Sequence, residues 1–287
     1  MKAVLLARGL GSRMKQAGAD GALSAEQASA AAAGAKGMMP IPSTALGAGG
    51  TAGSRPFLDY VLSALADAGC NQVCFVVAPD HSAIRSYYAG AGAPRRVSIS
   101  YAVQEVADGT ARAVQSAEDF AGRDPFLVLN SDNLYPAPVL RQLAALEGPG
   151  LPVYEHDSLI RDSGFPADRV AGFAAIEVDA NGILTRIVEK PGQEYYEAAL
   201  RLRSGQAGRP ILISMNVWRF DKRIFDACRD VPRSMRGEFE LPEAVGLAAA
   251  RGVPFQTFVA SGAVLDLSRR TDIALVSERL AAVEPNP

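Results

Sequence analysis

Two glycines and an arginine follow an apolar stretch close to the start of the chain. Residues 2–7, KAVLLA, are typical of a buried strand, and Gly9, Gly11 and Arg13 come directly after it. Glycine lets backbone N–H groups approach an anion closely, and the arginine adds a charge that persists at any ordinary pH. The pattern is compatible with a phosphate-binding loop and also with a flexible turn after a strand.

This loop differs from two common nucleotide-binding patterns. It is not followed by Gly-Lys-Ser/Thr, which excludes a Walker-type loop. A dinucleotide-binding loop would have a third glycine where Met14 stands, and an acidic residue ending a second strand about twenty residues later. Neither feature is found, so a dehydrogenase built on this loop is disfavoured.

A second candidate is Asp132, which follows the apolar stretch 126–130 in FLVLNSDNLYP. Open α/β sheets bind ligands at the carboxyl ends of their strands. A carboxylate there is a hard oxygen ligand of the kind that Mg²⁺ prefers. Asp132 as a turn residue or a helix N-cap is the alternative.

A third candidate is the pair Glu189 and Lys190, which ends an apolar stretch and precedes Pro191. The proline requires the strand to stop, so the pair lies at the end of the strand. Only five of the 29 basic residues are lysines, and an internal lysine in such a chain suggests a need for a compact point charge. A surface ion pair is the alternative.

The sequence around these candidates alternates between strand and helix patterns. Strands are expected at 2–7, 73–78, 97–103, 126–130, 211–220 and 253–259, and helices at 57–69, 110–120, 194–203 and within 239–251. Two further apolar stretches flank the turn 179–182 and predict a hairpin. The alternation predicts one α/β domain over 1–287, with a mixed, mainly parallel sheet covered by helices on both faces.

Two stretches beside the glycine loop look like insertions. Ser24 and Gln27 form a capping box before an alanine-rich run, which predicts a short helix over 24–33. Residues 43–54 are small and glycine-rich and are expected to be mobile. Both stretches are interpreted either as an active-site lid or as a surface insertion.

Composition excludes several classes of protein. The formal charge of −2, with 48% apolar and 21% charged residues and no basic stripe, argues against nucleic-acid binding. No apolar run is long enough for a membrane span or a signal peptide, so a cytoplasmic protein is expected. Three cysteines and two histidines without metal-ligand spacing disfavour zinc and Cys/His nucleophiles, and Cys70 and Cys74 are expected to pack as small apolar groups.

The order of the motifs along the chain is more specific than any one of them. After the glycine loop come K-x-x-x-P-I at 36–41, YAVQEVADGTARAV at 101–114, NSDNLY at 130–135 and EKP at 189–191. This order, from Lys2 to about Ile273, resembles the sugar-1-phosphate nucleotidyltransferases, and among them the glucose-1-phosphate thymidylyl- and uridylyltransferases. The resemblance implies a Rossmann-like, GT-A-type fold with a nucleotide half over about 1–135 and a sugar-phosphate half over about 136–287.

On the nucleotide side the resemblance implies that a nucleoside triphosphate lies on a set of residues along the first half of the chain: Ala7, Gly9, Gly11, Arg13, Gln104 and Gly109. Arg13 and Lys36 would neutralise phosphate charge, although Ala35 replaces the family's proline before the lysine. Gln104 would bind the base, and a glutamine there is more typical of the uridine and thymidine enzymes, although an amide can serve several bases.

For the metal and the acceptor the resemblance implies further residues: Asp132 and Asp266 for Mg²⁺, and Gly172, Glu189, Lys190 and Asn216 for the sugar phosphate. The sequence departs from the family around Asp266, where Val264 replaces a tryptophan and Ser268 and Arg269 replace Gly-Thr. Ala171 also replaces a tyrosine before Gly172.

The implied reaction belongs to the EC 2.7.7 class and is a Mg²⁺-dependent transfer of a nucleotidyl group from UTP or dTTP to a sugar-1-phosphate, with release of pyrophosphate. The catalytic set would be Arg13, Lys36, Asp132 and Lys190. Two alternatives stay open, a non-catalytic nucleotide-binding or regulatory paralogue and an enzyme for a cyclitol or other polyol phosphate. A GT-A glycosyltransferase is disfavoured because SDN has only one carboxylate of the usual D-x-D. Relatives often assemble as dimers or tetramers, so a homo-oligomer is compatible with the resemblance.

Overall fold

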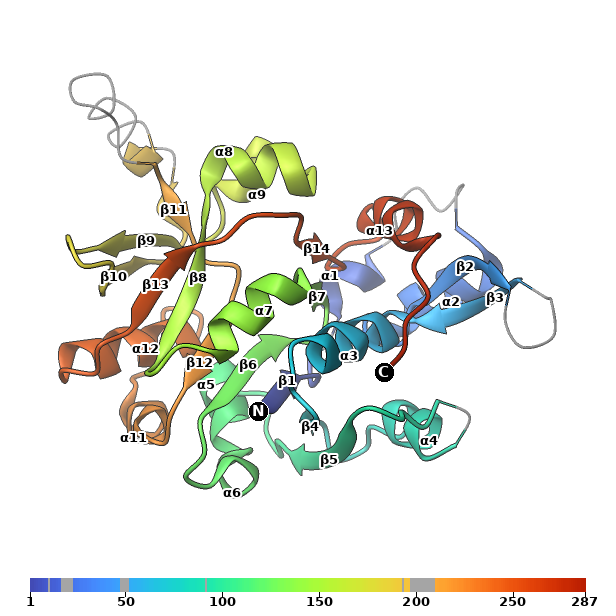
Figure 1. The fold of residues 1–287 in the computed structure, drawn as a ribbon, viewed down its shortest axis with the longest axis horizontal. Helices are drawn as coiled ribbons and strands as arrows, with labels where there is room; N and C mark the ends of the chain where they lie inside the picture. The colour runs from blue at the N-terminus through green and yellow to red at the C-terminus, as the bar shows by residue number, and fades with distance from the viewer. Residues whose placement is uncertain (10, 17–22, 47–51, 91, 193, 197–209) are drawn as a thin grey trace.

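The computed structural model of the chain describes all residues except 10, 17–22, 47–51, 91, 193 and 197–209. Its centre is one ten-stranded sheet, in which β13 pairs with β8 beside the main path of strands (Figure 1). The strands along the path are, in spatial order, β10 (Leu184–Val188), β9 (Ala175–Val178), β11 (Leu212–Ile213), β8 (Gly150–Glu155), β12 (Val217–Phe220), β6 (Phe126–Asn130), β1 (Lys2–Leu6), β4 (Gln72–Val77) and β5 (Ser98–Val103), and β13 is Gln256–Val259.

The two ends of this sheet differ in strand direction. The pairs of β6 with β1, β1 with β4 and β4 with β5 are all parallel. Beyond β6 the path from β12 to β10 is antiparallel, and only β13 adds a parallel pair there. The fold is therefore the expected mixed α/β sheet with a parallel core, and the expected hairpin is the pair β9–β10.

Two small sheets complete the strand inventory of the described residues. β2 (Pro40–Leu46) pairs with β3 (Ala52–Pro56), and β7 (Asn133–Leu134) pairs with β14 (Leu265–Asp266). The helices are, in chain order, α1 (Ser12–Lys15), α2 (Ala25–Ala33), α3 (Phe57–Asp67), α4 (Ala83–Ala89), α5 (Thr110–Gln115), α6 (Glu118–Ala121), α7 (Ala137–Ala144), α8 (His156–Ser158), the π-helical turn η1 (Leu159–Ser163), α9 (Ala167–Val170), α11 (Arg223–Asp230), α12 (Leu241–Ala250) and α13 (Asp272–Leu280).

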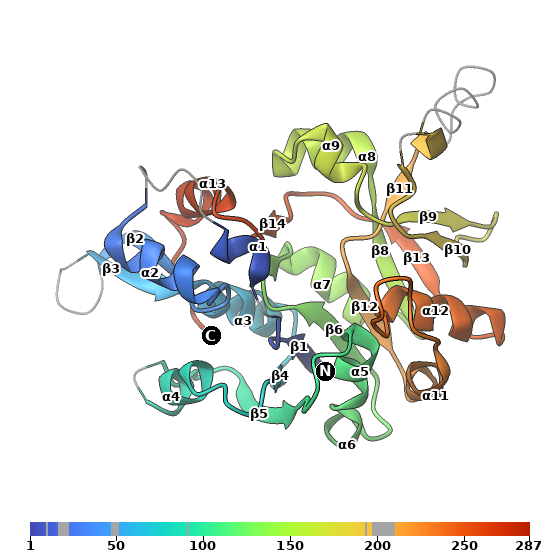
Figure 2. The same cartoon turned by 180° about the vertical axis from the view of Figure 1, so that it is seen from behind.

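Helices cover both faces of the sheet because alternate strand residues point to opposite sides. In β6, Leu127 and Leu129 belong to one buried cluster with α3 and α7, while Phe126 and Val128 belong to a second with α5, α11 and α12. Helices α3 and α7 lie on the near side of the sheet in Figure 1, and α5 lies on the near side in Figure 2. Each face of the parallel core is thus sealed from water, as its nearly continuous apolar strands require.

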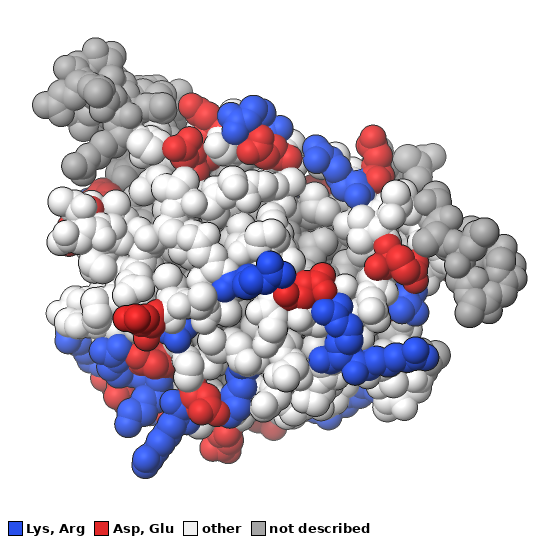
Figure 3. Space-filling model, viewed as in Figure 1, with Lys and Arg blue, Asp and Glu red and all other residues white. Residues whose placement is uncertain are grey.

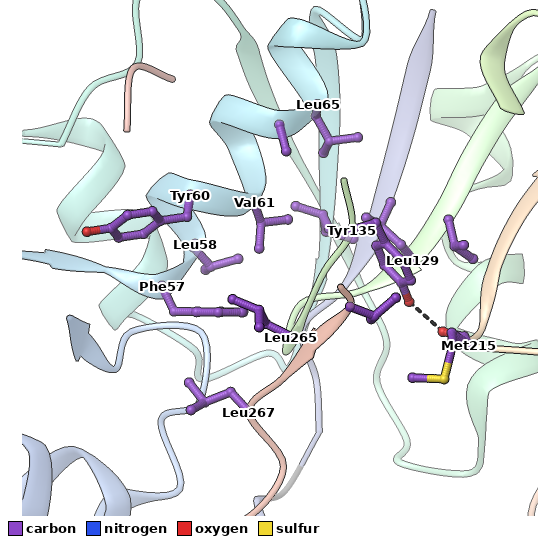
Figure 4. Packing of buried hydrophobic residues seen from close by; sticks show 14 of the residues in the cluster. Phe57, Leu58, Tyr60, Val61, Leu65, Leu129, Tyr135, Met215, Leu265 and Leu267 are labelled. Atoms are coloured by element: carbon purple, nitrogen blue, oxygen red, sulfur yellow. Dashed lines mark hydrogen bonds between the residues drawn. The ribbon is translucent and has the colours of Figure 1, made fainter. Parts of the chain in front are cut away.

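The cluster under α3 also supports the short strand β14. Figure 4 shows Phe57 and Val61 of α3 beside Leu265 of β14 and Tyr135, all of them buried. The Tyr135 hydroxyl donates to the Met215 carbonyl at 2.5 Å, which ties the end of β7 to the turn before β12. This packing fixes the segments that carry several of the candidate residues.

The sequence-based elements are confirmed for most of the core, and two of them are corrected by the structure. The strand expected at 211–220 is broken into β11 and β12, because Asn216 adopts a left-handed φ of 59° that a strand cannot continue. The helix expected at 110–120 is divided into α5 and α6. In the helix expected at 194–203, residues 197–203 lie outside the described residues.

The stretch 43–54, expected to be mobile, has its described ends in the paired strands β2 and β3. The hairpin is held by α2, which begins with the expected Ser24–Gln27 capping box. The Gln27 side chain donates to the Pro40 carbonyl and to the Ser277 hydroxyl of α13, both at 3.1 Å. Residues 47–51 lie outside the described residues.

The charged residues on the surface and the burial of the cysteines are as the composition predicts. On the face shown in Figure 3, acidic and basic side chains are interspersed. Cys70, Cys74 and Cys228 are buried and free, and burial raises the pKa of the Cys70 thiol to about 11. Across the described part of the chain, every helix is too short or too polar to span a bilayer.

Candidate active site

A cleft of about 880 Å³ opens at the carboxyl edge of the parallel strands. Backbone hydrogen bonds continue the sheet past the strand ends, from Ser131 N to Leu6 O (3.2 Å) and from Gln104 N to Val77 O (3.0 Å). The residues that follow β5 and β6 are thereby brought to one edge. This is the position at which open α/β sheets bind ligands.

The cleft gathers nearly all of the residues singled out from the sequence. Those that line it are Ala7, Gly9, Arg13, Lys36, Gln104, Gly109, Asp132, Gly172, Glu189, Lys190, Asn216 and Asp266. Gly11 does not line the cleft. Its φ is 62°, and a Cβ there would lie 2.5 Å from the Gly34 carbonyl oxygen, so Gly11 instead allows the glycine loop to contact the loop that carries Lys36.

Two cations come from these two loops. Arg13 lies on α1, is exposed, and forms no salt bridge with any residue that the structure describes. Lys36 follows α2, and its Nζ lies 2.8 Å from Asp132 Oδ2, with both side chains less than one-fifth exposed. One cation is therefore paired at the floor of the cleft, and the other is open to an anion.

Asp132 and Asp266 come together through the pairing of β7 with β14. Asn133 lies opposite Asp266 in the register, and Leu267 N donates to the Asp132 carbonyl at 2.8 Å. The Asp266 carboxylate is 8% exposed, and its Oδ1 is buried without a hydrogen-bond partner among the described residues. Burial raises the pKa of Asp266, and the neighbouring Asp132 charge raises it further.

These two carboxylates fit a divalent cation. An unpaired buried oxygen beside a second carboxylate is a hard ligand set, and the two cations in contact with it, Lys36 and Arg169, face three carboxylates, those of Asp132, Asp266 and Asp272. Among the described residues, His, Cys, Asp and Glu form no group of three or more that could hold a metal. A site with two carboxylates suits Mg²⁺, which takes its remaining ligands from phosphates and water.

Asp266 also contacts a buried arginine that the sequence analysis did not single out. Arg169 of α9 donates from Nη2 to Asp266 Oδ2 at 2.9 Å and from Nη1 to Asp272 Oδ1 at 2.6 Å. Asp272, at the start of α13, also accepts from the backbone N–H groups of Ser268 and Arg269. No local pattern could have revealed this cluster, because about a hundred residues separate Arg169 from its partners.

At another wall of the cleft, Gln104 is almost fully buried. Its Nε2 donates to the Gly109 carbonyl at 3.0 Å, which leaves Oε1 as the side-chain group available to a ligand. Gly109 has a φ of 125°, and a Cβ there would lie 2.2 Å from the Phe239 carbonyl oxygen. The segment around Phe239 therefore packs directly on this wall.

Arg8 stabilises the same wall through hydrogen bonds to the backbone. Its Nε donates to the Gln104 carbonyl at 2.6 Å and its Nη2 to the Glu105 carbonyl at 3.0 Å. Arg8, directly before Gly9, thus ties the loop after β1 to the loop after β5, and it lines the cleft.

The opposite wall carries two residues with strained backbone conformations. Lys190, with φ 44°, and Asn216, with φ 59°, are the only non-glycine residues with positive φ in the described ranges, and both line the cleft. Such backbone costs energy and is concentrated at functional sites. Reduced hydration and the nearby Glu240 carboxylate raise the pKa of Glu189, while Arg236 and Lys190 lower it.

A comparison with protein-family models gives a match to residues 50–273, described as nucleotidyl transferase. The chain belongs to the nucleotidyl transferase family. The glycine loop and Lys36 precede the matched range, so their resemblance rests on the motif order. The expected resemblance to sugar-1-phosphate nucleotidyltransferases is confirmed at the level of the family.

Two curated relatives of this nucleotidyl transferase carry more specific names. It is similar to the low-salt glycan biosynthesis nucleotidyltransferase Agl11 of Haloferax volcanii, with 26% identity over 222 residues, covering 76% of this chain and 55% of the relative. It is also similar to the glucose-1-phosphate thymidylyltransferase of Mycolicibacterium smegmatis, with 25% identity over 197 residues, covering 69% of this chain and 61% of the relative. The alignments therefore span less than two thirds of the length of these relatives.

Among solved structures, the nucleotidyl transferase resembles UDP-glucose pyrophosphorylase complexed with UDP-glucose. The TM-score is 0.67 at 18% identity, over 97% of each chain. At this identity the similarity demonstrates the shared fold, which agrees with the expected GT-A-type architecture.

Proposed function

We propose that this protein transfers a nucleotidyl group from UTP or dTTP to a sugar-1-phosphate and releases pyrophosphate, with Mg²⁺ bound by Asp132 and Asp266. The observation that carries the proposal is the meeting of Lys36, Asp132 and Asp266 at the floor of one cleft, with a buried, unpaired oxygen on Asp266. The names of the relatives support the same reaction class.

The chemistry requires positioning more than proton transfer. A phosphate oxygen of the acceptor attacks the α-phosphorus in line, the new P–O bond forms, and the bond from the α-phosphorus to the bridging oxygen breaks. The acceptor phosphate is already an anion, so no general base is needed. The protein must hold two anions together and offset their repulsion.

The chain supplies cations for this from both sides of the cleft. Arg13 and Lys36 are assigned to the triphosphate, and Lys190 is assigned to the acceptor phosphate. On binding, Lys36 would exchange its contact with Asp132 for a phosphate oxygen. A bound Mg²⁺ would offset charge on the phosphates, and the protein's part is to present Asp132 and Asp266 to it.

Gln104 supports the assignment of the base. With its Nε2 committed to Gly109, its Oε1 is an acceptor that fits the N3–H of uracil or thymine. The imino N–H of guanine has the same polarity, so GTP belongs in any screen. The triphosphate substrate also makes the cytoplasm the expected location.

The acceptor is assigned to the wall formed by Gly172, Glu189, Lys190 and Asn216. A carboxylate and an amide that line the same cleft can hydrogen-bond to hydroxyl groups, which a sugar presents. The same polarity fits a cyclitol or another polyol, so the acceptor panel includes both classes.

The test is pyrophosphate release with four triphosphates, each combined with hexose-1-phosphates and with cyclitol or polyol phosphates. We expect release with UTP or dTTP and a hexose-1-phosphate, and its loss on addition of EDTA. Tight nucleotide binding in a thermal-shift assay, without release for any pair, would instead indicate a non-catalytic nucleotide-binding protein.

A further inference from the structure

We propose that Arg169 is a positioning residue that fixes the Asp266 carboxylate so that Oδ1 alone faces the metal. The proposal rests on the proposed function, because it concerns the metal site assigned there. Arg169 lies on α9, on the acceptor side of the fold, while Asp266 lies on β14 beside the nucleotide half. It therefore links the two walls of the cleft.

The contacts of Arg169 form a mostly buried cluster at the cleft, which Arg169 also lines. Its side chain is 9% exposed, and it donates to one oxygen of Asp266 and to both oxygens of Asp272. Its guanidinium also lies 5.0 Å from the ring centre of Phe165. A planar group with several fixed donors can hold two carboxylates at once, which a lysine ammonium does less specifically.

The cluster is anchored by backbone on its far side. Asp272 Oδ2 accepts from Ser268 N at 3.0 Å and from Arg269 N at 2.7 Å. Asp272 cannot shift without disturbing the turn that follows β14. Arg169 is therefore held in place by Asp272 and in turn holds Asp266.

In this arrangement one oxygen of the Asp266 carboxylate binds Arg169, and the other is left for the metal. Oδ2 accepts from Arg169, whereas Oδ1 is buried and unpaired among the described residues, and Asp132 comes directly before the neighbouring strand β7. An outer partner that occupies one oxygen orients the other toward a metal. It also restricts Asp266 to a single oxygen in metal binding.

The cluster carries more negative than positive charge, which favours binding of a cation. Arg169 contributes one positive charge against the two carboxylates of Asp266 and Asp272, and Asp132 is paired with Lys36. Without Arg169, Asp266 and Asp272 would repel each other in a buried site, and Asp266 would lose its fixed orientation. Removal of Arg169 would also remove a positive charge that repels the metal. A positioning role therefore predicts weaker metal binding in the variants, whereas charge alone predicts tighter metal binding.

The test compares Arg169→Lys and Arg169→Met with wild type by Mn²⁺ titration, followed by electron paramagnetic resonance. The titrations use protein saturated with a non-cleavable α,β-methylene UTP analogue. We expect about 10-fold or greater weakening of Mn²⁺ binding in both variants. Binding of the analogue alone in EDTA should stay within about twofold of wild type. Arg161→Lys is the matched control, because Arg161 lies nearby on η1 but is 67% exposed and pairs with Asp162.

The outcomes separate this inference from the proposed function. Tighter or unchanged Mn²⁺ binding in the folded variants would overturn the positioning role while leaving the metal site intact. If wild-type protein binds no Mn²⁺ with the analogue, the metal assignment itself fails. Should the variants not fold, a crystal structure of wild type with Mn²⁺ and the analogue decides the question. Arg169 on Oδ2 with Mn²⁺ on Oδ1 supports the inference, and Arg169 displaced from Asp266 contradicts it.

Discussion

The two walls of the cleft are built in different ways. On the nucleotide side, Gln104 and Asp132 directly follow parallel strands, and backbone hydrogen bonds to neighbouring strands hold them in register. On the acceptor side, Lys190 and Asn216 lie where antiparallel strands stop, in left-handed backbone conformations. Regular sheet pairing positions the groups assigned to the base and the metal, whereas the groups assigned to the acceptor lie in strained backbone outside the strands.

This difference suggests that one wall mainly affects turnover and the other mainly affects acceptor preference. Positions tied to the sheet can hold charge rigidly against a developing transition state, which affects turnover. Turns outside the sheet can vary in shape between relatives and set acceptor preference without disturbing the sheet. Substitutions on the two walls should therefore have distinct kinetic signatures.

The largest effect is expected for Asp132→Asn. The substitution keeps size and hydrogen bonding but removes one of the two charges offered to Mg²⁺, a contribution of several kcal/mol to the transition state. We expect kcat to fall by about 100-fold or more, with KM for the acceptor little changed. Asp124→Asn, on the surface beside Lys2, is the control. Normal turnover in Asp132→Asn would exclude Asp132 as a metal ligand.

Lys190→Ala tests the other wall. Loss of a charge-assisted hydrogen bond to the acceptor phosphate costs about 1.5–3 kcal/mol, which corresponds to a rise in KM of about 10- to 100-fold. Turnover at saturating acceptor should change much less. Lys222→Ala, exposed at the start of α11, should behave as wild type. A fall in kcat with unchanged KM would instead assign Lys190 to the transition state and weaken the contrast between the walls.

The contrast between the walls also explains what the sequence could predict. Buried strands such as 126–130 can be predicted because a short apolar run that ends in a polar loop is typical of a buried strand. The roles of Lys36 and Asp132 are predicted from the order of the motifs along the chain. The break at Asn216 is hidden inside the strand-like run ILISMNVWRF. The strand β14 has two residues, too few for any periodicity, and its role depends on pairing with β7. Arg169 depends on tertiary packing alone.

Asn216 tests whether strain is present on the acceptor wall. Alanine at a left-handed position costs about 1–2 kcal/mol, whereas glycine adopts it freely. We expect Asn216→Ala to lower the free energy of unfolding by about 1 kcal/mol in urea denaturation, and Asn216→Gly to lower it less. Both variants should raise the acceptor KM. Asn181→Ala, in the exposed β9–β10 turn, is the control. Equal stability of the alanine and glycine variants would show that the left-handed backbone is not strained.

The smallest effect is expected for Arg8→Gly, which removes a brace and not a catalytic charge. Arg8 donates to the Gln104 and Glu105 carbonyls, and its loss frees the loop that presents Gln104 to the base. A change of about 1 kcal/mol in the relative binding of two triphosphates corresponds to roughly fivefold. We therefore expect the kcat/KM ratio between UTP and dTTP or GTP to shift by that order, with turnover on the preferred triphosphate nearly unchanged. Arg8→Lys keeps the charge but cannot hold both carbonyls in the same fork, so it should shift the ratio in the same direction. If neither variant alters the ratio, the brace does not influence base selection, and the nucleotide wall depends on sheet pairing alone.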